Sequence, residues 1–347
     1  MKCGRAGVVL ALGLAAGVAP APSSDGPYSR LKEIPIGGEG GWDYLSVDAG
    51  ARRLYVSHAT KVVVVDLDKD SVVGEIAAAP GVHGIAVAPE LGRGFVTNGR
   101  ANTVSVVDLK TLQILQAVET GANPDAILYE PKGREVYAVN HTGHSVTVFA
   151  ANSGKVRATI PLPGVGEFAV LDAERGQVFV NVEDTSQLVA IDTASHQVTA
   201  TWPLAPGEEP TGLAFDPRAR RLFVACGNEK LAMIDAATGR VLASVPIGAG
   251  ADGAAFDPGT GLAFASSSDG TLTIARPQGD TLRVVQTLST PKRSRTMTLD
   301  PKTHRLYVSA AEFGPPPTGA DGRPQRPPVS PGTFRVVVYE MVAPPGR

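Results

Sequence analysis

The sequence is poor in the residues and motifs that mark the commonest cofactor and hydrolase chemistries. It contains 2 Cys and 2 Trp among 347 residues. It has no Cys-x-x-Cys-His, His-Glu-x-x-His, Gly-x-Ser-x-Gly or Gly-Lys-Ser/Thr motif. These absences exclude covalent c-type haem attachment and the zinc-protease, serine-hydrolase and P-loop classes that those motifs define.

Long apolar runs and net charge are also lacking. The apolar run at residues 8–19 has 12 residues, too few to cross a hydrocarbon core of about 30 Å as a helix. It follows Lys2 and Arg5 and precedes small residues at 19–21, so residues 1–26 are predicted to be a secretory signal peptide with a short leader. The sequence therefore predicts a periplasmic or secreted protein without a stable membrane anchor.

Export has consequences for charge and for cysteine. The formal net charge is −2, and removal of the two basic leader residues makes it −4. A mildly acidic protein is not expected to bind nucleic acid. Cys226 would be the one cysteine of the mature chain, so no internal disulfide is expected, and we predict a buried, inert thiol.

What the sequence does contain is a repeat. A turn residue recurs at intervals of 40, 42, 42, 44, 41 and 43 residues, at Asp48, Ala88, Glu130, Asp172, Asp216, Asp257 and Asp300. An aromatic residue follows each of them at a constant interval of seven, at Tyr55, Phe95, Tyr137, Phe179, Phe223, Phe264 and Tyr307. Seven copies of one spacing indicate a repeat architecture.

Each repeat is typical of four short strands. In the fifth they are predicted at residues 211–215, 221–225, 231–235 and 241–247, separated by Asp-Pro, Gly-Asn and Thr-Gly turns. A four-stranded sheet per repeat predicts an all-β, seven-bladed β-propeller at residues 27–341, with a tail at 342–347. Its blades are expected near residues 41–80, 81–121, 122–164, 165–209, 210–251, 252–293 and 294–341.

The seventh repeat lacks a fourth strand, and the N-terminal segment can supply it. Residues 31–37 end in Pro-Ile-Gly, as does the fourth strand at 242–248. We predict that residues 31–37 complete the last blade, because this pairing removes an exposed sheet edge.

The repeats resemble a known family. Phe95-Val-Thr-Asn98 after Gly84-Ile-Ala-Val-Ala-Pro, together with Tyr137-Ala-Val-Asn140 and Pro210-Thr-Gly-Leu-Ala-Phe-Asp-Pro, is similar to the YVTN repeat of bacterial YncE-like propellers. The resemblance covers about residues 30–341. It implies the seven-bladed fold but no single function, since such repeats serve binding proteins, surface proteins and enzyme domains.

The repeat also locates the mouth of the central channel, where propellers place ligand sites. Five residues before each turn residue, no position is apolar: Asp43, His83, Asp125, Glu167, Thr211, Asp252 and Arg295. Two positions later none is polar: Leu45, Ile85, Ile127, Ala169, Leu213, Ala254 and Met297. We call the first set the rim and predict that it binds a small polar ligand.

Four rim carboxylates and one Arg must be neutralised, and the sequence leaves two routes open. In the first, Arg295 pairs with Asp252 and Asp43 while His83 pairs with Asp43 and Asp125, which makes Glu167 the carboxylate least served. In the second, the rim holds a divalent cation through Asp43, Asp125, Glu167, Asp252 and His83. Oxygen ligands favour calcium or magnesium, whereas a direct His83 bond favours zinc, manganese or iron.

The loops that join the second and third strands lie on the same face. They carry His58, Asn98, Arg100, Asn140, His141, His144, Glu183, Asp184, Glu229 and Lys230. His141 and His144 could together ligate a transition metal, or they could be solvated turn residues. The Pro-rich loop at residues 312–333 has seven prolines and is either a lid over the mouth or a segment without a role there.

Three functions fit these features. The first is a monomeric propeller that binds a polar ligand or a divalent cation. The second is a metal-dependent, lactonase-like hydrolase or lyase at the same rim, with Glu167, Asp125 and His83 as catalytic candidates. The third is a structural propeller or one that binds a protein partner. The variety of residue types around the rim favours the first two.

Overall fold

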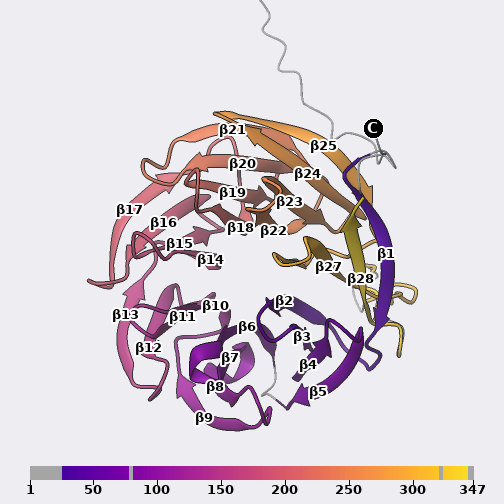
Figure 1. The fold of residues 1–347 in the computed structure, drawn as a ribbon, viewed down its shortest axis with the longest axis horizontal. Helices are drawn as coiled ribbons and strands as arrows, with labels where there is room; N and C mark the ends of the chain where they lie inside the picture. Colours follow the sequence, from indigo (N-terminus) through magenta and orange to yellow (C-terminus); the bar gives the residue numbers. More distant parts are fainter. Residues whose placement is uncertain (1–25, 78–80, 320–322, 343–347) are drawn as a thin grey trace, which may run out of the picture.

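Seven four-stranded antiparallel sheets surround a central channel in the computed structural model, as Figure 1 shows. The structure describes residues 26–77, 81–319 and 323–342. The predicted signal peptide lies almost wholly outside the described residues. Within these ranges, no helix has the length and apolarity that crossing a membrane requires. The predicted fold class is confirmed.

Every blade runs from an innermost strand at the channel to an outermost strand at the periphery. Blades one to three consist of β2 (Trp42–Asp48), β3 (Arg53–His58), β4 (Lys61–Asp66) and β5 (Ser71–Ile76); β6 (Val82–Ala88), β7 (Arg93–Asn98), β8 (Thr103–Asp108) and β9 (Ile114–Glu119); and β10 (Pro124–Glu130), β11 (Glu135–Asn140), β12 (Ser145–Ala150) and β13 (Val156–Pro161). Blade two also has two short 3₁₀ helices, η1 (Pro89–Leu91) and η2 (Gly99–Ala101).

Blades four to seven follow the same plan. They consist of β14 (Gly166–Asp172), β15 (Gln177–Val182), β16 (Gln187–Asp192) and β17 (Gln197–Pro203); β18 (Pro210–Asp216), β19 (Arg221–Cys226), β20 (Lys230–Asp235) and β21 (Val241–Pro246); β22 (Ala251–Asp257), β23 (Leu262–Ser267), β24 (Thr271–Gln278) and β25 (Thr281–Ser289); and β26 (Met297–Asp300), β27 (Arg305–Ala310), β28 (Arg335–Met341) and β1 (Tyr28–Pro35). The four strands of blade five agree with the prediction to within one residue at most ends.

Six of the seven turn residues of the repeat accept local hydrogen bonds at the end of the innermost strand, and the exception is Ala88, which has no polar side chain. Asp216 Oδ1 accepts hydrogen bonds from the backbone N–H groups of Arg218 and Ala219, at 2.9 and 3.3 Å. Asp48 Oδ1 accepts one from Ala51 N–H at 2.9 Å. A side chain that satisfies the turn backbone in this way specifies a tight connection between the first and second strands.

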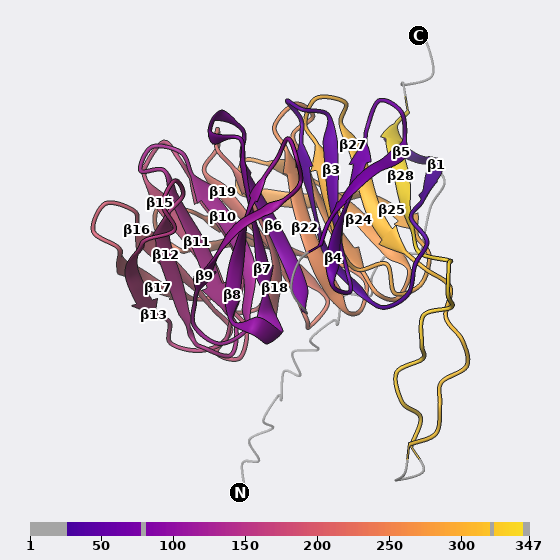
Figure 2. The same ribbon diagram turned by 90° about the horizontal axis from the view of Figure 1, so that it is seen from below.

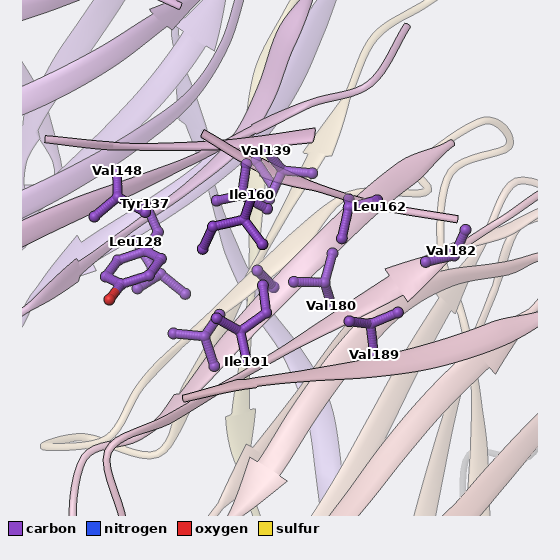
Figure 3. Close-up of a cluster of buried hydrophobic side chains, with 14 residues drawn as sticks. Leu128, Tyr137, Val139, Val148, Ile160, Leu162, Val180, Val182, Val189 and Ile191 are labelled. Atoms are coloured by element: carbon purple, nitrogen blue, oxygen red, sulfur yellow. The ribbon is translucent and has the colours of Figure 1, made fainter. Parts of the chain in front are cut away.

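The core lies between neighbouring blades rather than within one blade. Figure 3 shows the cluster between blades three and four, where Val139, Val148 and Ile160 face Val180 and Ile191. The aromatic residues of the repeat are all buried in such interfaces. Because both faces of each sheet are covered, the strands are apolar on both sides and alternate only weakly. Cys226 is also buried, as predicted, and burial raises the pKa of its thiol to about 12.

The N-terminal strand closes the ring, as predicted. β1 pairs antiparallel with β28, and Ile34 lies opposite Val336. In Figure 1 the indigo β1 lies beside the yellow β28 at the periphery. The side chains of Tyr28 and Ile34 are fully buried, so the seam is sealed by packing as well as by strand pairing.

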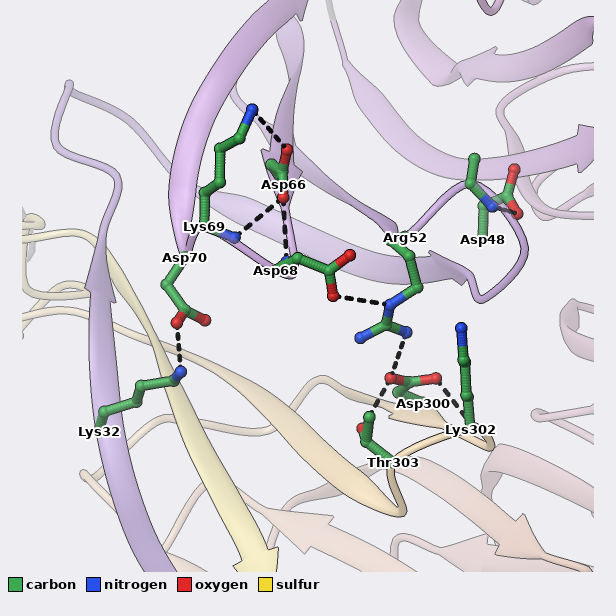
Figure 4. A network of polar contacts seen from close by, with 11 residues as sticks. Lys32, Asp48, Arg52, Asp66, Asp68, Lys69, Asp70, Asp300, Lys302 and Thr303 are labelled. Atoms are coloured by element: carbon green, nitrogen blue, oxygen red, sulfur yellow. Dashed lines mark hydrogen bonds and ion pairs between the residues drawn. The ribbon is translucent and has the colours of Figure 1, made fainter.

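On the face away from the rim, a polar network spans the same seam (Figure 4). Arg52 of blade one donates to the buried carboxylate of Asp300 of blade seven, with Nη1 2.7 Å from Oδ2. Arg52 Nε also lies 3.0 Å from Oδ1 of the exposed Asp68. This buried ion pair joins blades one and seven, and it adds to the strand pairing and packing that close the ring.

Candidate metal centre at the channel mouth

A break in strand register places the rim side chains at the channel mouth. In six blades the pairing of the innermost strand with the second strand shifts near the rim residue, for example between Trp42 and Leu45 and between Pro124 and Ile127. Such bulges redirect a side chain and often occur beside binding sites. Six rim residues lie within these shifts, and Arg295 lies two residues before the start of β26.

Hydroxyl groups on the second strands support this irregular backbone. Ser57 Oγ accepts a hydrogen bond from Asp43 N–H and donates to Tyr44 O, both at 3.0 Å. Thr97 Oγ1 accepts from Gly84 N–H at 2.8 Å and donates to Asp125 O at 2.7 Å. Thr97 is the threonine of the Phe-Val-Thr-Asn motif, so the motif that indicated the fold also builds the rim.

Five residues form an alternating series of carboxylates and imidazoles, which we call the arc: Asp43, His83, Asp125, His141 and Glu167. His83 Nδ1 lies 2.6 Å from Asp43 Oδ2 and 3.7 Å from Asp125 Oδ1. His141 Nδ1 lies 3.0 Å from Glu167 Oε2. Asp125 belongs to both three-residue groups, one with His83 and one with His141, in which all ligand atoms are within 4.8 Å of one another.

Asp125 is the least satisfied member of the arc. Its side chain is buried, the residue being 8% exposed, and its Oδ1 has no hydrogen-bond partner among the described residues. Burial raises the pKa of this carboxyl well above its usual range, and the charges of Asp43 and Glu167 raise it further. A buried carboxylate without donors is costly unless a cation accompanies it.

The structure corrects two expectations about pairing. Glu167 is not the carboxylate least served, because His141 reaches it from the β11–β12 loop of the neighbouring blade. The hydrogen bond that His141 donates to Glu167, together with the charge of that carboxylate, raises the pKa of His141 to about 9. Arg295 contacts Asp252, with Nη1 2.9 Å from Oδ2, but no ion pair joins it to Asp43 in the described chain.

The remaining rim residues, Thr211, Asp252 and Arg295, do not belong to the arc. Burial raises the pKa of Asp252 to about 7, despite the opposing charge of Arg295. Thr211 Oγ1 donates to Ala251 O at 2.9 Å, so its hydroxyl hydrogen serves the backbone. Both residues line a central cavity of about 420 Å³ together with the arc.

The loop residues separate into cavity residues and structural ones. Glu183 lines the central cavity and Arg100 lines a neighbouring one. His144 is exposed and belongs to neither three-residue group, so it lies outside the arc that contains His141. His58 is buried and stacks on Phe334 with ring centroids 4.6 Å apart, and Asn140 donates to Ser145 and Thr147.

Sequence reasoning missed an aromatic contact across the channel. The rings of Tyr44 and Phe168, from blades one and four, meet edge-to-face with centroids 5.1 Å apart. Blades one and four are not adjacent in the ring, so this contact spans the channel. Burial, together with Asp125 and Glu167, raises the pKa of Tyr44 well above its usual range. The available signal was an aromatic residue directly after two of the acidic rim positions.

The Pro-rich loop forms a hairpin at the edge of the mouth. Phe313 bridges Val329 and Thr318 bridges Pro324, and Figure 2 shows the hairpin extending away from the blades. Its base borders a cavity of about 700 Å³ next to the central one, lined in part by Trp42, Arg100, Arg295, Arg326 and Val329. Trp42 packs on Phe334, in the cluster that contains Ile34 of the closing strand.

The raised pKa of Asp252 predicts a pH dependence of stability. The native state holds a proton on this carboxyl between about pH 4 and pH 7, whereas the unfolded chain, with the ordinary value of 3.8, does not. The free energy of unfolding therefore falls as the pH rises through that window, by up to about 1.4 kcal/mol per pH unit from this group. Arg295 opposes the shift and Asp43, Glu167 and Glu183 reinforce it.

Urea unfolding in chelator at pH 5 and pH 7.5 measures this dependence. Asp252→Asn should be less sensitive to pH across the window than the unsubstituted chain. His141, whose raised pKa gives stability that is lost as the pH rises through about 9, acts in the same direction and remains in both proteins. Equal slopes for the two proteins would contradict the assignment.

Comparison with known proteins agrees with the fold. Residues 53–290, more than half of the chain, match the family model described as the cytochrome D1 heme domain. The proteins YncE of Salmonella typhi and Salmonella typhimurium, both described as uncharacterized, are 31% identical over 111 residues, which is 31% of this chain and 31% of each relative. The match thus spans under a third of those relatives. Hydrazine synthase of Kuenenia stuttgartiensis matches with a TM-score of 0.70 at 18% identity, over 78% of this chain and 92% of that one.

Proposed function

From the premise that this chain belongs to the cytochrome D1 heme domain family and is a YncE-like propeller, we propose that its channel mouth binds a divalent metal ion rather than a haem. The observation that carries the proposal is Asp125, a buried carboxylate whose Oδ1 has no hydrogen-bond partner in the described chain and which lies between two imidazoles. A bound cation would neutralise the buried negative charge of this carboxylate.

The residues at the mouth do not fit a haem. A haem needs apolar walls for its ring and an axial His, Cys, Met or Tyr ligand. The described lining of the central cavity includes five carboxylates, and its one side chain of purely apolar character is that of Ala251. Covering these carboxylates with an apolar ring would leave them desolvated without partners, at a cost of several kcal/mol each.

The wider cavity beside it is less polar but offers no axial ligand. His83 is its only His, Cys, Met or Tyr among the described lining residues. The Nδ1 atom of His83 contacts Asp43. The Nε2 atom of His83 lies so close to Gly99 that a Cβ atom added to this glycine would be 2.6 Å from Nε2. The imidazole is therefore oriented for the arc and not for a ring in the wider cavity.

The ligand types favour a transition ion. The oxygen-rich rim predicted from the sequence favours calcium or magnesium, but the arc adds the nitrogen of His141 to that of His83. Each three-residue group offers two carboxylates and one imidazole, a set that suits zinc or manganese and leaves coordination positions open. An anionic ligand could fill them from the cavity that Arg100, Arg295 and Arg326 border.

Thermal unfolding with and without metal tests the proposal. A chain treated with chelator should gain stability when zinc or manganese is added, by about 2.7 kcal/mol at a concentration 100 times the Kd. For a chain of this size this corresponds to a rise in Tm of roughly 4 °C. Asp125→Asn should remove most of the response, because the shared ligand loses its charge.

His144→Asn is the matched control, because it removes an imidazole from the loop that carries His141 but lies outside the arc. Asparagine tolerates the positive φ of 43° at this position. It should keep the full response. A melting curve that none of zinc, manganese, calcium or magnesium shifts would overturn the proposal. A panel of lactones assayed with the metal-loaded protein would separate binding alone from metal-dependent hydrolysis.

A further inference from the structure

We propose that the arc binds two divalent ions, bridged by the carboxylate of Asp125, one held with His83 and Asp43 and the other with His141 and Glu167. This inference rests on the proposed function and adds the number of ions, their separate ligand sets and the bridge. Nothing in the rim pattern of the sequence required more than one ion.

Geometry argues against a single ion that uses the whole arc. Ligand atoms bound to one zinc ion lie about 2.0–2.2 Å from it, so any two of them are at most about 4.4 Å apart. The atoms of each three-residue group meet a limit of 4.8 Å, but the five residues form two such groups rather than one. One ion can therefore take one group, and the other group remains available.

Asp125 has the properties of a bridging ligand. It is the one member common to both groups, and a carboxylate can accept through both of its oxygens. It is buried, and its Oδ1 has no hydrogen-bond partner among the described residues. In two-metal sites the ions lie about 3.5–4 Å apart, a separation that one carboxylate can span.

The charge of the cavity balances two ions better than one. The five carboxylates that line it are Asp43, Asp125, Glu167, Glu183 and Asp252, and Arg295 is the one guanidinium. Metal binding requires deprotonated ligands; with all five carboxylates ionised and both imidazoles neutral, the formal charge is −4, which two divalent cations neutralise and one cation halves. Uncompensated like charges in a partly buried cavity are unfavourable, so electrostatics favours the second ion once the first is bound.

The number of bound ions tests the inference. The full mature chain, stripped with chelator and then dialysed against manganese, is expected to retain two ions per chain by elemental analysis. Manganese ions that share a carboxylate are magnetically coupled, so the EPR spectrum should be broadened compared with that of an isolated ion. This measurement needs no substitution and cannot fail through misfolding.

Variants assign the two ions. His83→Ala and His141→Ala should each retain about one ion, whereas His144→Asn should retain two. One ion in the unsubstituted chain, with an uncoupled spectrum, would overturn the bridged pair and leave the proposed function standing. No bound ion, together with an unshifted melting curve, would overturn both.

Discussion

Removal of the closing strand, residues 27–38, is expected to destabilise strongly a chain that begins at Gly26. Tyr28 and Ile34 are fully buried, and burial of each contributes roughly 1.5–3 kcal/mol. The deletion also uncovers the paired edge of β28, from Arg335 to Met341. A total loss of about 5 kcal/mol or more is comparable to the whole stability of many domains.

Thermal and urea unfolding of two chains, one that begins at Gly26 and one that begins at Glu39, would measure this effect. The shorter chain should melt at a much lower temperature or fail to fold. In the second case a synthetic peptide of residues 27–38 should restore folding when added in trans, because it can pair with β28. The same peptide with Ile34→Asp should not. Equal melting temperatures for the two chains would show that β1 does not close the ring.

The second large effect is expected at Asp300, on the opposite face of the same seam. Its side chain is fully buried, and its Oδ2 accepts hydrogen bonds from Arg52 and Thr303, both at 2.7 Å. Burial alone would raise the pKa of Asp300, but the hydrogen bonds from Thr303 and Arg52 outweigh it and lower the pKa. Asp300→Ala should cost about 3–5 kcal/mol, since it leaves Arg52 without its buried partner.

Asp68 provides the matched control, because it binds the same guanidinium at 3.0 Å but its side chain is 66% exposed. An exposed ion pair contributes about 0–1 kcal/mol, so Asp68→Ala should lower the free energy of unfolding by no more than about 1 kcal/mol. The lowered pKa of Asp300 gives stability that is present at neutral pH and lost as the pH falls through the folded value. The effect of Asp300→Ala should therefore shrink in acid, and similar effects of the two substitutions at pH 7 would contradict this account.

The buried carboxylates of Asp300 and Asp125 differ in how completely the chain satisfies their hydrogen bonds. At Asp300 every partner of the buried carboxylate comes from the chain itself, through Arg52, Thr303 and the turn backbone. At Asp125 the chain leaves an oxygen without a donor. The buried Asp172 also has an oxygen without a hydrogen bond, but Arg220 Nη2 lies 3.0 Å from that oxygen. Asp125 Oδ1 has neither a hydrogen-bond donor nor a guanidinium in the described chain, and this difference points to a ligand rather than to a defect of packing.

Local patterns in the sequence were sufficient for the blades and for the positions of the rim. The constant interval from turn residue to aromatic residue predicted the first hairpin of each repeat. In most repeats the turn side chain accepts hydrogen bonds from the turn backbone, and the aromatic residue of the second strand is buried between blades. The same register located Asp43, His83 and Asp125 at the mouth. The Pro-Ile-Gly ending identified the closing strand, since a missing fourth strand must be supplied from elsewhere in the chain.

Only the tertiary structure decided which charged groups meet. His141 was visible in the sequence as a loop residue, but its contact with Glu167 depends on how the β11–β12 loop lies against the next blade. The same holds for the hairpin base, which borders the cavity beside the rim. Strands and turns are specified by neighbours along the chain, and they repeat. Contacts between blades depend on the relative orientation of two sheets and on loops of unequal length, which no repeat encodes.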